Sequence, residues 1–291
     1  MSGIHPSSYI GPKASVGEGV EIGPFCVVES GASIGTGCVL ESHVVVRAST
    51  RIGERNYLAE GTVLGGPAQH KQGGLKSGRL DVGDDNTFRE HVTVHCGLSE
   101  EGVTTIGDDN LLMVNSHVAH DCFLANQTIL ANNVMLAGHV HVADSAFLSG
   151  AVGIHQFCRV GTFAMVGGQA HITKDVPPYV TVDGVSSLIV GLNVVGLRRG
   201  GFDRSQIQEL KDGYRLAFRS GLRWDDAISA LRERFPEGHC SLLADFMAGT
   251  KRGCVQERRM PKPATIRLHV PDAKGKQAEE SEKKASALFA G

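Results

Sequence analysis

An apolar residue, nearly always aliphatic, recurs at every sixth position through most of the chain between Ile4 and Ile172. The repeat covers residues 4–64, 82–94 and 106–172. A period of six matches neither the 3.6 residues of a helical turn nor the simple alternation of a strand meander. It is the signature of a parallel β-helix built from hexapeptide repeats, in which the chain winds around an aliphatic core. We therefore predict a mainly β fold, a left-handed parallel β-helix.

Composition agrees with a narrow coil and excludes some functions. Aromatic residues make up 5% of the chain and glycines number 37, as expected where the interior accepts small branched side chains. The net charge of −2 gives no reason to expect a nucleic-acid partner. The hexapeptide pattern begins at once, and no run approaches the roughly 18 apolar residues of a membrane span. We expect a cytoplasmic protein without a transmembrane segment.

The repeat divides the chain into three predicted parts. Residues 1–178 form the β-helix, interrupted by two polar loops at 65–81 and 95–105. Pro177 and Pro178 cannot extend a hydrogen-bonded ladder, which indicates a boundary. Residues 179–259 have helical periodicity, with helices predicted over 204–220, 225–235 and 242–247 and Asp203 as the first N-cap. Residues 260–291 lack an apolar period and are predicted to be a disordered tail.

Histidines cluster in the second half of the repeat. Three hexapeptides make one coil, so residues three repeats apart are expected to stack. This places His120, Gly138 and Gln156 in one column and Asp121 with His139 in the next. These groups should converge within about two rungs, roughly 10 Å.

This cluster is suited to acyl transfer. A neutral His120 can take a proton from an acceptor hydroxyl near its own pKa. Asp121 or a backbone carbonyl can orient the ring, and the Gly138 amide can stabilise an oxyanion.

Other interpretations of the histidines remain open at this point. They could fill corners and form hydrogen bonds between subunits, or they could bind zinc, as in hexapeptide-coil carbonic anhydrases. A purely structural, filament-forming coil is a third possibility. The helical region and the two loops favour acyl transfer over these, and we expect no metal. Exposed β surfaces and coil edges predict a homo-oligomer, and a three-fold arrangement suits a triangular prism.

Several motifs resemble one family closely. These are His117-Val-Ala-His120-Asp-Cys, Ile129-Leu-Ala-Asn-Asn133, Ala137-Gly-His139-Val, His155-Gln-Phe-Cys158, Met165-Val-Gly-Gly168 and Asp175-Val-Pro-Pro-Tyr179. Together they resemble the UDP-N-acetylglucosamine O-acyltransferases of lipid A biosynthesis, over about residues 4–250. The resemblance implies a homotrimer that moves a 3-hydroxyacyl chain from acyl carrier protein to the 3-hydroxyl of UDP-GlcNAc, with active sites between subunits.

The same resemblance implies a role for each matching position. It makes His120 the general base, Asp121 the residue that aligns it and Gly138 the oxyanion donor. It places the following residues in substrate binding: Gln69, His117, His139, His155, Gln156, Gly168, Asn193 and Arg199. Gly168 matches the position that measures acyl length, where glycine predicts a long chain. No dissociable cofactor is implied, because phosphopantetheine arrives on the donor. A surplus of basic residues over 198–259, 13 Lys and Arg against 9 Asp and Glu, suits an acidic carrier protein.

The chain departs from the family pattern at four positions. His70 and Gln72 stand where the family has an acidic residue and a lysine, and Val195 and Gly200 replace a glutamate and a second basic residue. These positions handle the sugar nucleotide. A related acceptor, such as a UDP-sugar with an amine at position 3, therefore remains an alternative.

Overall fold

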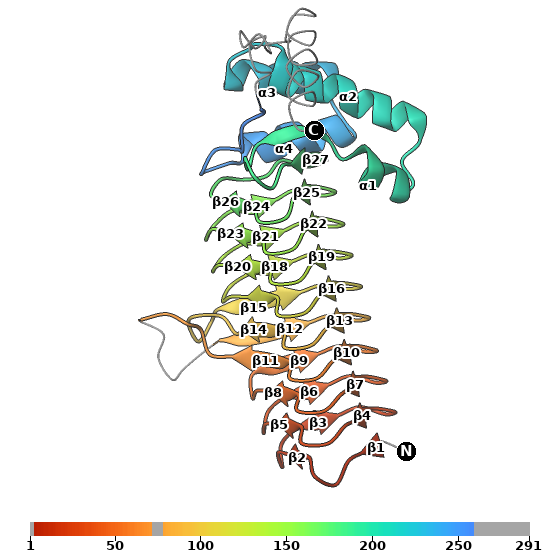
Figure 1. The fold of residues 1–291 in the computed structure, drawn as a ribbon. Coiled ribbons are helices and arrows are strands. Elements are labelled where there is room, and N and C mark those ends of the chain that lie inside the picture. Colours follow the sequence, from red (N-terminus) through yellow and green to blue (C-terminus); the bar gives the residue numbers. More distant parts are fainter. Residues whose placement is uncertain (1–2, 72–77, 259–291) are drawn as a thin grey trace, which may run out of the picture. The chain divides into compact units, whose positions relative to one another are not determined.

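The computed structural model describes residues 3–71 and 78–258, where short strands stack into a parallel coil (Figure 1). Where no loop intervenes, strands three hexapeptides apart pair in parallel, as in Gly3 with Glu21 and Ser15 with Ser33. Each turn contributes one strand to each of three sheets. The predicted left-handed parallel β-helix followed by helices is confirmed.

Within the described residues, sheet A has eleven strands, sheet B nine and sheet C eight. Sheet A contains β1 (Gly3–Ile4), β4 (Glu21–Ile22), β7 (Val39–Leu40), β10 (Tyr57–Leu58), β13 (Thr87–Phe88), β16 (Leu111–Leu112), β19 (Ile129–Leu130), β22 (Phe147–Leu148), β25 (Met165–Val166), β27 (Val180–Val182) and β28 (Ile189–Leu192). Sheet B contains β2 (Tyr9–Ile10), β5 (Val27–Val28), β8 (Val45–Val46), β11 (Val63–Gly66), β14 (Thr93–His95), β17 (His117–Val118), β20 (Met135–Leu136), β23 (Gly153–Ile154) and β26 (His171–Ile172). Sheet C contains β3 (Ser15–Val16), β6 (Ser33–Ile34), β9 (Thr50–Ile52), β12 (Arg79–Val82), β15 (Val103–Ile106), β18 (Phe123–Leu124), β21 (His141–Val142) and β24 (Arg159–Val160).

The core of the coil has two inward positions per hexapeptide. The repeat residue itself points inward, and Leu40 and Val46 are 1% and 0% exposed. A smaller side chain four residues later fills a second position, as Cys26 and Cys38 do at 1% and 0% exposure. Burying such side chains stabilises the fold by about 25 cal/mol per Å² of apolar surface. The repeat is therefore a packing requirement of every turn.

Three asparagines and a threonine replace these small apolar side chains in four successive turns of the coil. The side-chain oxygen of Asn56 accepts hydrogen bonds from the backbone and side-chain N–H groups of Asn86, at 2.9 and 3.0 Å. Asn86 accepts from Asn110 in the same way, and Asn110 accepts from Thr128. All four residues are at most 2% exposed. We call this array the inner amide ladder. The apolar repeat of the sequence does not predict these buried polar residues.

Both predicted loops interrupt the coil, but the strands on either side reach further into them than expected. The first connection joins β11, which ends at Gly66, to β12, which begins at Arg79. The second joins β14, which ends at His95, to β15, which begins at Val103. Figure 1 shows the described start of the first connection, which leads up to residue 71, projecting from the side of the coil.

The coil continues past the two prolines. β27 pairs in parallel with β25, with Thr181 opposite Met165, and β28 then adds an antiparallel strand. The predicted boundary at residue 178 therefore lies just before the last parallel strand. The prolines occupy the connection, where no ladder N–H is needed. The predicted tail, 260–291, lies outside the described residues.

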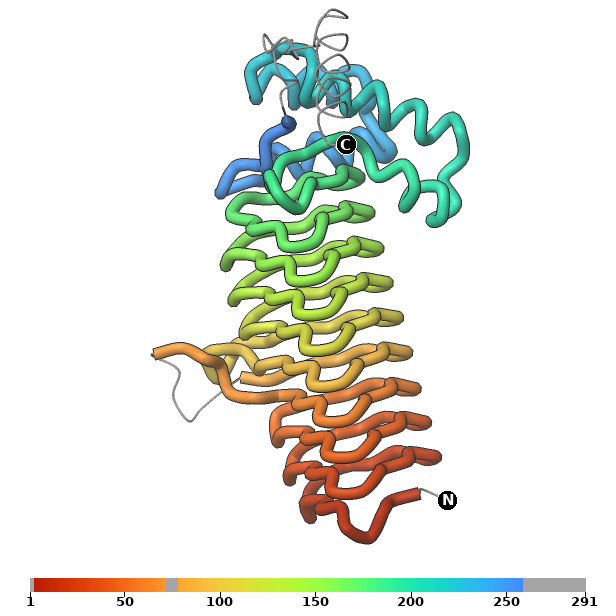
Figure 2. The backbone as a smooth tube through the Cα atoms, in the orientation of Figure 1, coloured from red at the N-terminus to blue at the C-terminus, as the bar shows by residue number. Residues whose placement is uncertain are grey.

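In the part of the chain that the structure describes, four helices follow the coil: α1 (Val194–Arg199), α2 (Arg204–Arg219), α3 (Trp224–Arg234) and α4 (His239–Ala248). Figure 2 shows them at the end of the coil formed by its last turns. Asp203 caps α2 as predicted. Its side chain accepts from the Gln206 N–H at 2.8 Å, and the Gln206 side chain accepts from the Asp203 N–H at 2.9 Å, which forms a capping box. The short helix α1 was not predicted.

Arg159 joins the helices to the coil. Its guanidinium donates to the buried Asp175 carboxylate at 2.9 Å and to the carbonyl of Phe246 in α4 at 2.9 Å. It also lies 4.2 Å from the centre of the Phe246 ring, within the range of a cation–π interaction. These contacts fix α4 against the last turns of the coil.

Candidate active site

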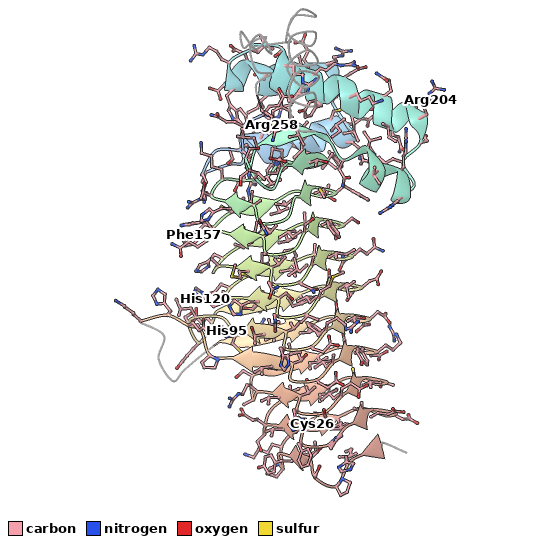
Figure 3. The ribbon with its side chains drawn as sticks, viewed as in Figure 1. Cys26, His95, His120, Phe157, Arg204 and Arg258 are labelled. Carbon is pink, nitrogen blue, oxygen red and sulfur yellow. The ribbon has the colours of Figure 1, made fainter. Side chains whose placement is uncertain are left out.

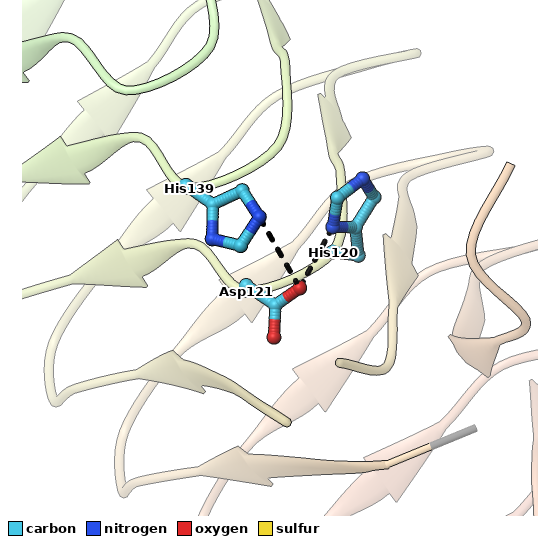
Figure 4. A group of neighbouring side chains, drawn as sticks. All are labelled: His120, Asp121 and His139. Carbon is cyan, nitrogen blue, oxygen red and sulfur yellow. Dashed lines mark hydrogen bonds and ion pairs between the residues drawn. The ribbon is translucent and has the colours of Figure 1, made fainter. Parts of the chain in front are cut away.

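His120 lies at a corner of the coil, two residues after β17 (Figure 3). The residue is 8% exposed, and its Nδ1 lies 2.8 Å from Oδ2 of Asp121 (Figure 4). A carboxylate only accepts hydrogen bonds, so Nδ1 donates and Nε2 carries the lone pair. Among the described residues none forms a hydrogen bond with Nε2. This nitrogen can therefore accept a proton from a bound molecule.

The second loop holds Asp121 in place. The backbone N–H of Leu98 donates to Asp121 Oδ2 at 3.1 Å, and the Asp121 N–H donates to the hydroxyl of Thr104 at 2.8 Å. Asp121 has a φ of 57°, in the left-handed region that the corners of this coil require and that aspartate tolerates. Its carboxylate is thus oriented by the fold before any ligand binds. Nε2 of His139 lies 3.7 Å from the same oxygen.

Gly138 stands directly against the His120 ring, one turn along the coil. A Cβ atom at this position would lie 2.5 Å from Cε1 and 2.6 Å from Nε2 of His120. No side chain fits there, so glycine is required for the imidazole to keep its position. The backbone confirms the predicted stacking, because the His139 N–H donates to the His120 carbonyl at 3.0 Å and the Phe157 N–H donates to the Gly138 carbonyl at 3.2 Å.

The Gly138 N–H takes no part in the β-helix ladder. Gly138 is the second residue after a repeat position, a place that holds Pro6, Pro12 and Pro24 in the first turns. Since proline has no backbone N–H, the fold does not require a hydrogen bond from the backbone N–H at this position of the repeat. Among the described residues no carbonyl accepts from the Gly138 amide. The backbone N–H of Gly138 and Nε2 of His120, neither of which is hydrogen-bonded within the described residues, therefore lie next to each other.

A groove of about 670 Å³ runs along sheet B beside these two residues. It is lined by Gln69, His70, His117, Ala119, His120, Met135, Leu136, Ala137, Gly138, Gly153, Ile154, His155, Gln156 and His171. The predicted residues Gln69, His117, His155 and Gln156 are thus brought together with His120 and Gly138. A Cβ on Gly153 would meet no atom within 4 Å, so this glycine leaves the floor of the groove open.

His117, which lines the groove, packs against a second histidine, His95. Nδ1 of His117 lies 2.7 Å from the hydroxyl of Thr93, and burial lowers the pKa of His117. The rings of His95 and His117 meet edge to face with 4.7 Å between centres. Burial, together with the neighbouring His117 and His120, lowers the pKa of His95 to about 4. Both rings are therefore neutral near pH 7. No motif in the sequence indicates a role for His95.

His120, Asp121 and His139 are also the one group of side chains, among the described residues, with ligand atoms placed closely enough to hold a metal ion. Because Asp121 orients His120, the same atoms cannot serve as a metal site and as a base with its partner at the same time.

None of the helices in the described part of the chain is long and apolar enough to cross a membrane. Residues 175–255 match the family model described as UDP-N-acetylglucosamine O-acyltransferase, domain 2. The chain is 43% identical over 258 residues to the acyl-[acyl-carrier-protein]–UDP-N-acetylglucosamine O-acyltransferase of Halorhodospira halophila, covering 88% of this chain and 100% of the relative. The protein of the same name from Myxococcus xanthus is 44% identical over 256 residues, covering 87% and 99%.

The chain belongs to the UDP-N-acetylglucosamine O-acyltransferase family. Solved structures agree. The Francisella novicida UDP-N-acetylglucosamine acyltransferase has a TM-score of 0.85 at 34% identity, covering 88% of this chain and 95% of that one. LpxA from Acinetobacter baumannii has a TM-score of 0.82 at 39% identity, covering 87% and 100%. These names support the acyltransferase interpretation, and not the carbonic anhydrase or 3-amino-sugar alternatives.

Four residues that the family resemblance assigns to substrate binding do not line the groove of this chain: His139, Gly168, Asn193 and Arg199. Gly168 is in the turn after β25, where a Cβ would lie 3.3 Å from the Gly150 carbonyl oxygen. Asn193 caps α1 by accepting from the Gly196 N–H, and its amide donates to the Phe163 carbonyl. Arg199 is exposed in the last turn of α1. Their roles stay predictions.

The departures from the family pattern have different structural settings. His70 lines the groove, and its ring centre lies 5.9 Å from that of His120. A Cβ on Gly200 would lie 2.4 Å from the Phe163 ring, so packing excludes a basic side chain there unless Phe163 moves. Val195 is 59% exposed and contributes nothing to the groove. Gln72 lies outside the described residues.

Proposed function

We propose that this chain transfers a 3-hydroxyacyl group from acyl carrier protein to the 3-hydroxyl of UDP-GlcNAc, the first step of lipid A biosynthesis. The names of its relatives support this reaction at 37–44% identity. One observation supports the mechanism most directly. Nε2 of His120 and the backbone N–H of Gly138 lie side by side without hydrogen-bond partners among the described residues, and Asp121 orients the His120 ring.

In the proposed mechanism His120 acts as a general base and then as a general acid. Nε2 takes the proton of the sugar 3-hydroxyl as its oxygen attacks the thioester carbonyl. The tetrahedral intermediate places its negative charge at the Gly138 N–H. When the intermediate collapses, the C–S bond breaks and the imidazolium returns its proton to the leaving pantetheine thiolate. The ester and the free thiol are the products, and Asp121 stabilises the transient imidazolium throughout.

The groove supplies the binding residues. We propose that the donor and the sugar are contacted by the lining residues Gln69, His117, His155 and Gln156. We propose the same role for His139, whose Nε2 lies 3.7 Å from Oδ2 of Asp121. Gly168 is proposed to leave room for a long acyl chain, and Asn193 and Arg199 to contact the nucleotide. No metal or dissociable cofactor is part of the proposal, because the donor carries its own phosphopantetheine.

Assembly and localisation complete the proposal: a homotrimer in the cytoplasm, with active sites between subunits. Large apolar side chains on the outside of the coil support association. Tyr9, Phe25, Met135 and Phe157 are each more than half exposed in the single chain. Covering such side chains is a common reason for subunits to assemble. The basic surplus of the helical region supports an acidic carrier protein as donor.

A product assay tests the function. The purified protein is given acyl carrier protein loaded with a mixture of 3-hydroxyacyl chains, together with UDP-GlcNAc and, separately, its 3-amino analogue. We expect an ester at the 3-hydroxyl of UDP-GlcNAc, with long chains preferred. Gly168→Met should shift that preference to shorter chains. Transfer only to the 3-amino sugar, or none to either, would overturn the proposal.

A further inference from the structure

The cluster in Figure 4 presents three metal-ligating atoms toward one point. Oδ2 of Asp121 lies 2.8 Å from Nδ1 of His120 and 3.7 Å from Nε2 of His139, and all three atoms lie within 4.8 Å of one another. The exposed fractions of the His120 and Asp121 side chains are 10% and 15%, whereas that of His139 is 38%. One side of the cluster is therefore accessible.

These separations suit a tetrahedral zinc ion. Zinc–nitrogen and zinc–oxygen bonds of about 2.0–2.2 Å place neighbouring ligand atoms roughly 3.3–3.6 Å apart. The two distances to Asp121 bracket this value. On binding, the distance to His120 would lengthen by about 0.5–0.8 Å and that to His139 would shorten by about 0.1–0.4 Å. The more exposed His139 ring can adjust most easily. Three protein ligands leave the fourth position for water.

Asp121 is already prepared as a ligand. The Leu98 N–H donates to Oδ2, and this hydrogen bond persists when a metal ion replaces the His120 proton on the same oxygen. Hydrogen bonds that orient a ligating carboxylate raise metal affinity. The rings of His95 and His117 also lie close together, but within the described part of the chain no carboxylate is hydrogen-bonded to either ring, and Nδ1 of His117 is hydrogen-bonded to Thr93.

We propose that His120, Asp121 and His139 form an inhibitory site for Zn²⁺ and similar divalent transition-metal ions. A metal ion binds Nδ1 of His120 only when that nitrogen carries no proton, so the ring proton moves to Nε2. Nε2–H is then a donor and cannot accept the proton of the sugar hydroxyl. The positive ion also disfavours formation of an imidazolium beside it. Metal binding and base catalysis exclude each other at this site.

The inhibitory consequence rests on the proposed acyl transfer, but the binding site does not, so binding is measured first and without substrates. Zinc affinity is measured by competition with a chromogenic chelator, and coordination geometry by the visible absorption spectrum of the Co²⁺ form. His141→Gln is the matched control, because His141 is an exposed histidine two residues from His139 that is absent from the cluster. The test variant is His139→Gln.

We expect one zinc ion per chain, a tetrahedral Co²⁺ spectrum, and an affinity reduced by about 100-fold or more in His139→Gln but unchanged in His141→Gln. Equal affinity in the wild type and His139→Gln would overturn the site, as would an equal loss in both variants. A failure of this experiment says nothing against acyl transfer.

The activity measurement follows, with each protein compared with its own metal-free rate. Zinc should inhibit the wild type and His141→Gln at concentrations that match the measured affinity, and a chelator should restore the rate. His139→Gln should require about 100-fold more zinc for the same inhibition. Zinc that occupies the site without slowing transfer, or that accelerates it, would contradict the inhibitory role. Absence of transfer in the metal-free wild type would instead contradict the proposed function.

Discussion

Two polar arrays run along the coil, and they use their hydrogen bonds differently. In the inner amide ladder, Asn56, Asn86 and Asn110 each accept two hydrogen bonds from the next turn, so the side-chain oxygens are saturated. At the histidine corner, one nitrogen of His120 is fixed by Asp121, while Nε2 and the Gly138 amide have no partner among the described residues. Both arrays come from the same stacking of turns.

The difference between the two arrays distinguishes polar groups that stabilise the fold from polar groups that are available to a ligand. A buried polar group that stays unpaired costs roughly 1–3 kcal/mol, so a ladder that serves only the fold is expected to satisfy every group. The histidine corner borders the groove, where a ligand can supply the missing partners. We therefore expect substitutions in the ladder to reduce stability, and substitutions at the corner to reduce activity.

The largest effect should follow from His120→Ala. Loss of the general base should lower the rate of acyl transfer by about 10²- to 10⁴-fold. The melting temperature should change little, because the ring lines an open groove. Steady-state kinetics and thermal melting measure the two effects, with His141→Ala as the control histidine. A near-normal rate in His120→Ala would contradict the assignment of the base.

The second prediction concerns pH and the buried His95. Its pKa is about 4 in the folded protein and 6.5 in the unfolded chain, so below 6.5 the unfolded chain binds more protons. The stabilising contribution is complete above pH 6.5 and is lost as the pH falls toward 4, by about 3 kcal/mol. His95→Gln should flatten the dependence of melting temperature on pH over this window. His91→Gln, at an exposed position, should not; equal slopes in all three proteins would contradict the burial argument.

The third prediction is the reverse of the first, because it expects a loss of stability while activity is kept. Asn86→Ala removes one of the two hydrogen bonds to the Asn56 oxygen and takes the acceptor away from the backbone and side-chain N–H groups of Asn110. It should lower the free energy of unfolding by about 2 kcal/mol. The rate of transfer per folded molecule should stay within twofold of the wild type, roughly the effect of 0.5 kcal/mol. Asn126→Ala removes an exposed amide and serves as the control in denaturant unfolding. If Asn86→Ala lowers transfer but not stability, the comparison between the arrays is wrong.

The smallest effect should come from His70→Asp, which restores the family's acidic residue beside the groove. We expect the KM for the sugar nucleotide to fall by about fivefold, the value of one hydrogen bond, with kcat nearly unchanged. His91→Asp controls for the added charge. A large change in kcat and no change in KM would place His70 in the chemical step.

Much of this could be predicted from the sequence because packing fixes the repeat. The turn of three hexapeptides predicts Gly138 beside His120, and the backbone hydrogen bonds from His139 to His120 and from Phe157 to Gly138 confirm it. The second loop adds residues to one turn, so the spacing of three hexapeptides does not hold across it. Across it Thr93 pairs with His117, further along the chain than three hexapeptides, so His95 could not be assigned to its position beside His117.

Other features depend on packing that a linear pattern does not record. The inner amide ladder places polar residues in an inward position, which the apolar repeat argues against until their mutual hydrogen bonds are seen. The strand β27 follows two prolines that indicated an end to the coil. The reason for glycine at position 200 is the neighbouring Phe163 ring, from a distant part of the chain.

The most direct test of the account is a crystal structure of the protein with its proposed product, the 3-O-acylated UDP-GlcNAc. We predict that the ester oxygen at the sugar 3-position lies within hydrogen-bonding distance of Nε2 of His120, and that the acyl carbonyl oxygen points at the Gly138 N–H. A product bound with its ester away from both groups would contradict the central claim that the unpaired donor and acceptor at this corner perform the chemistry.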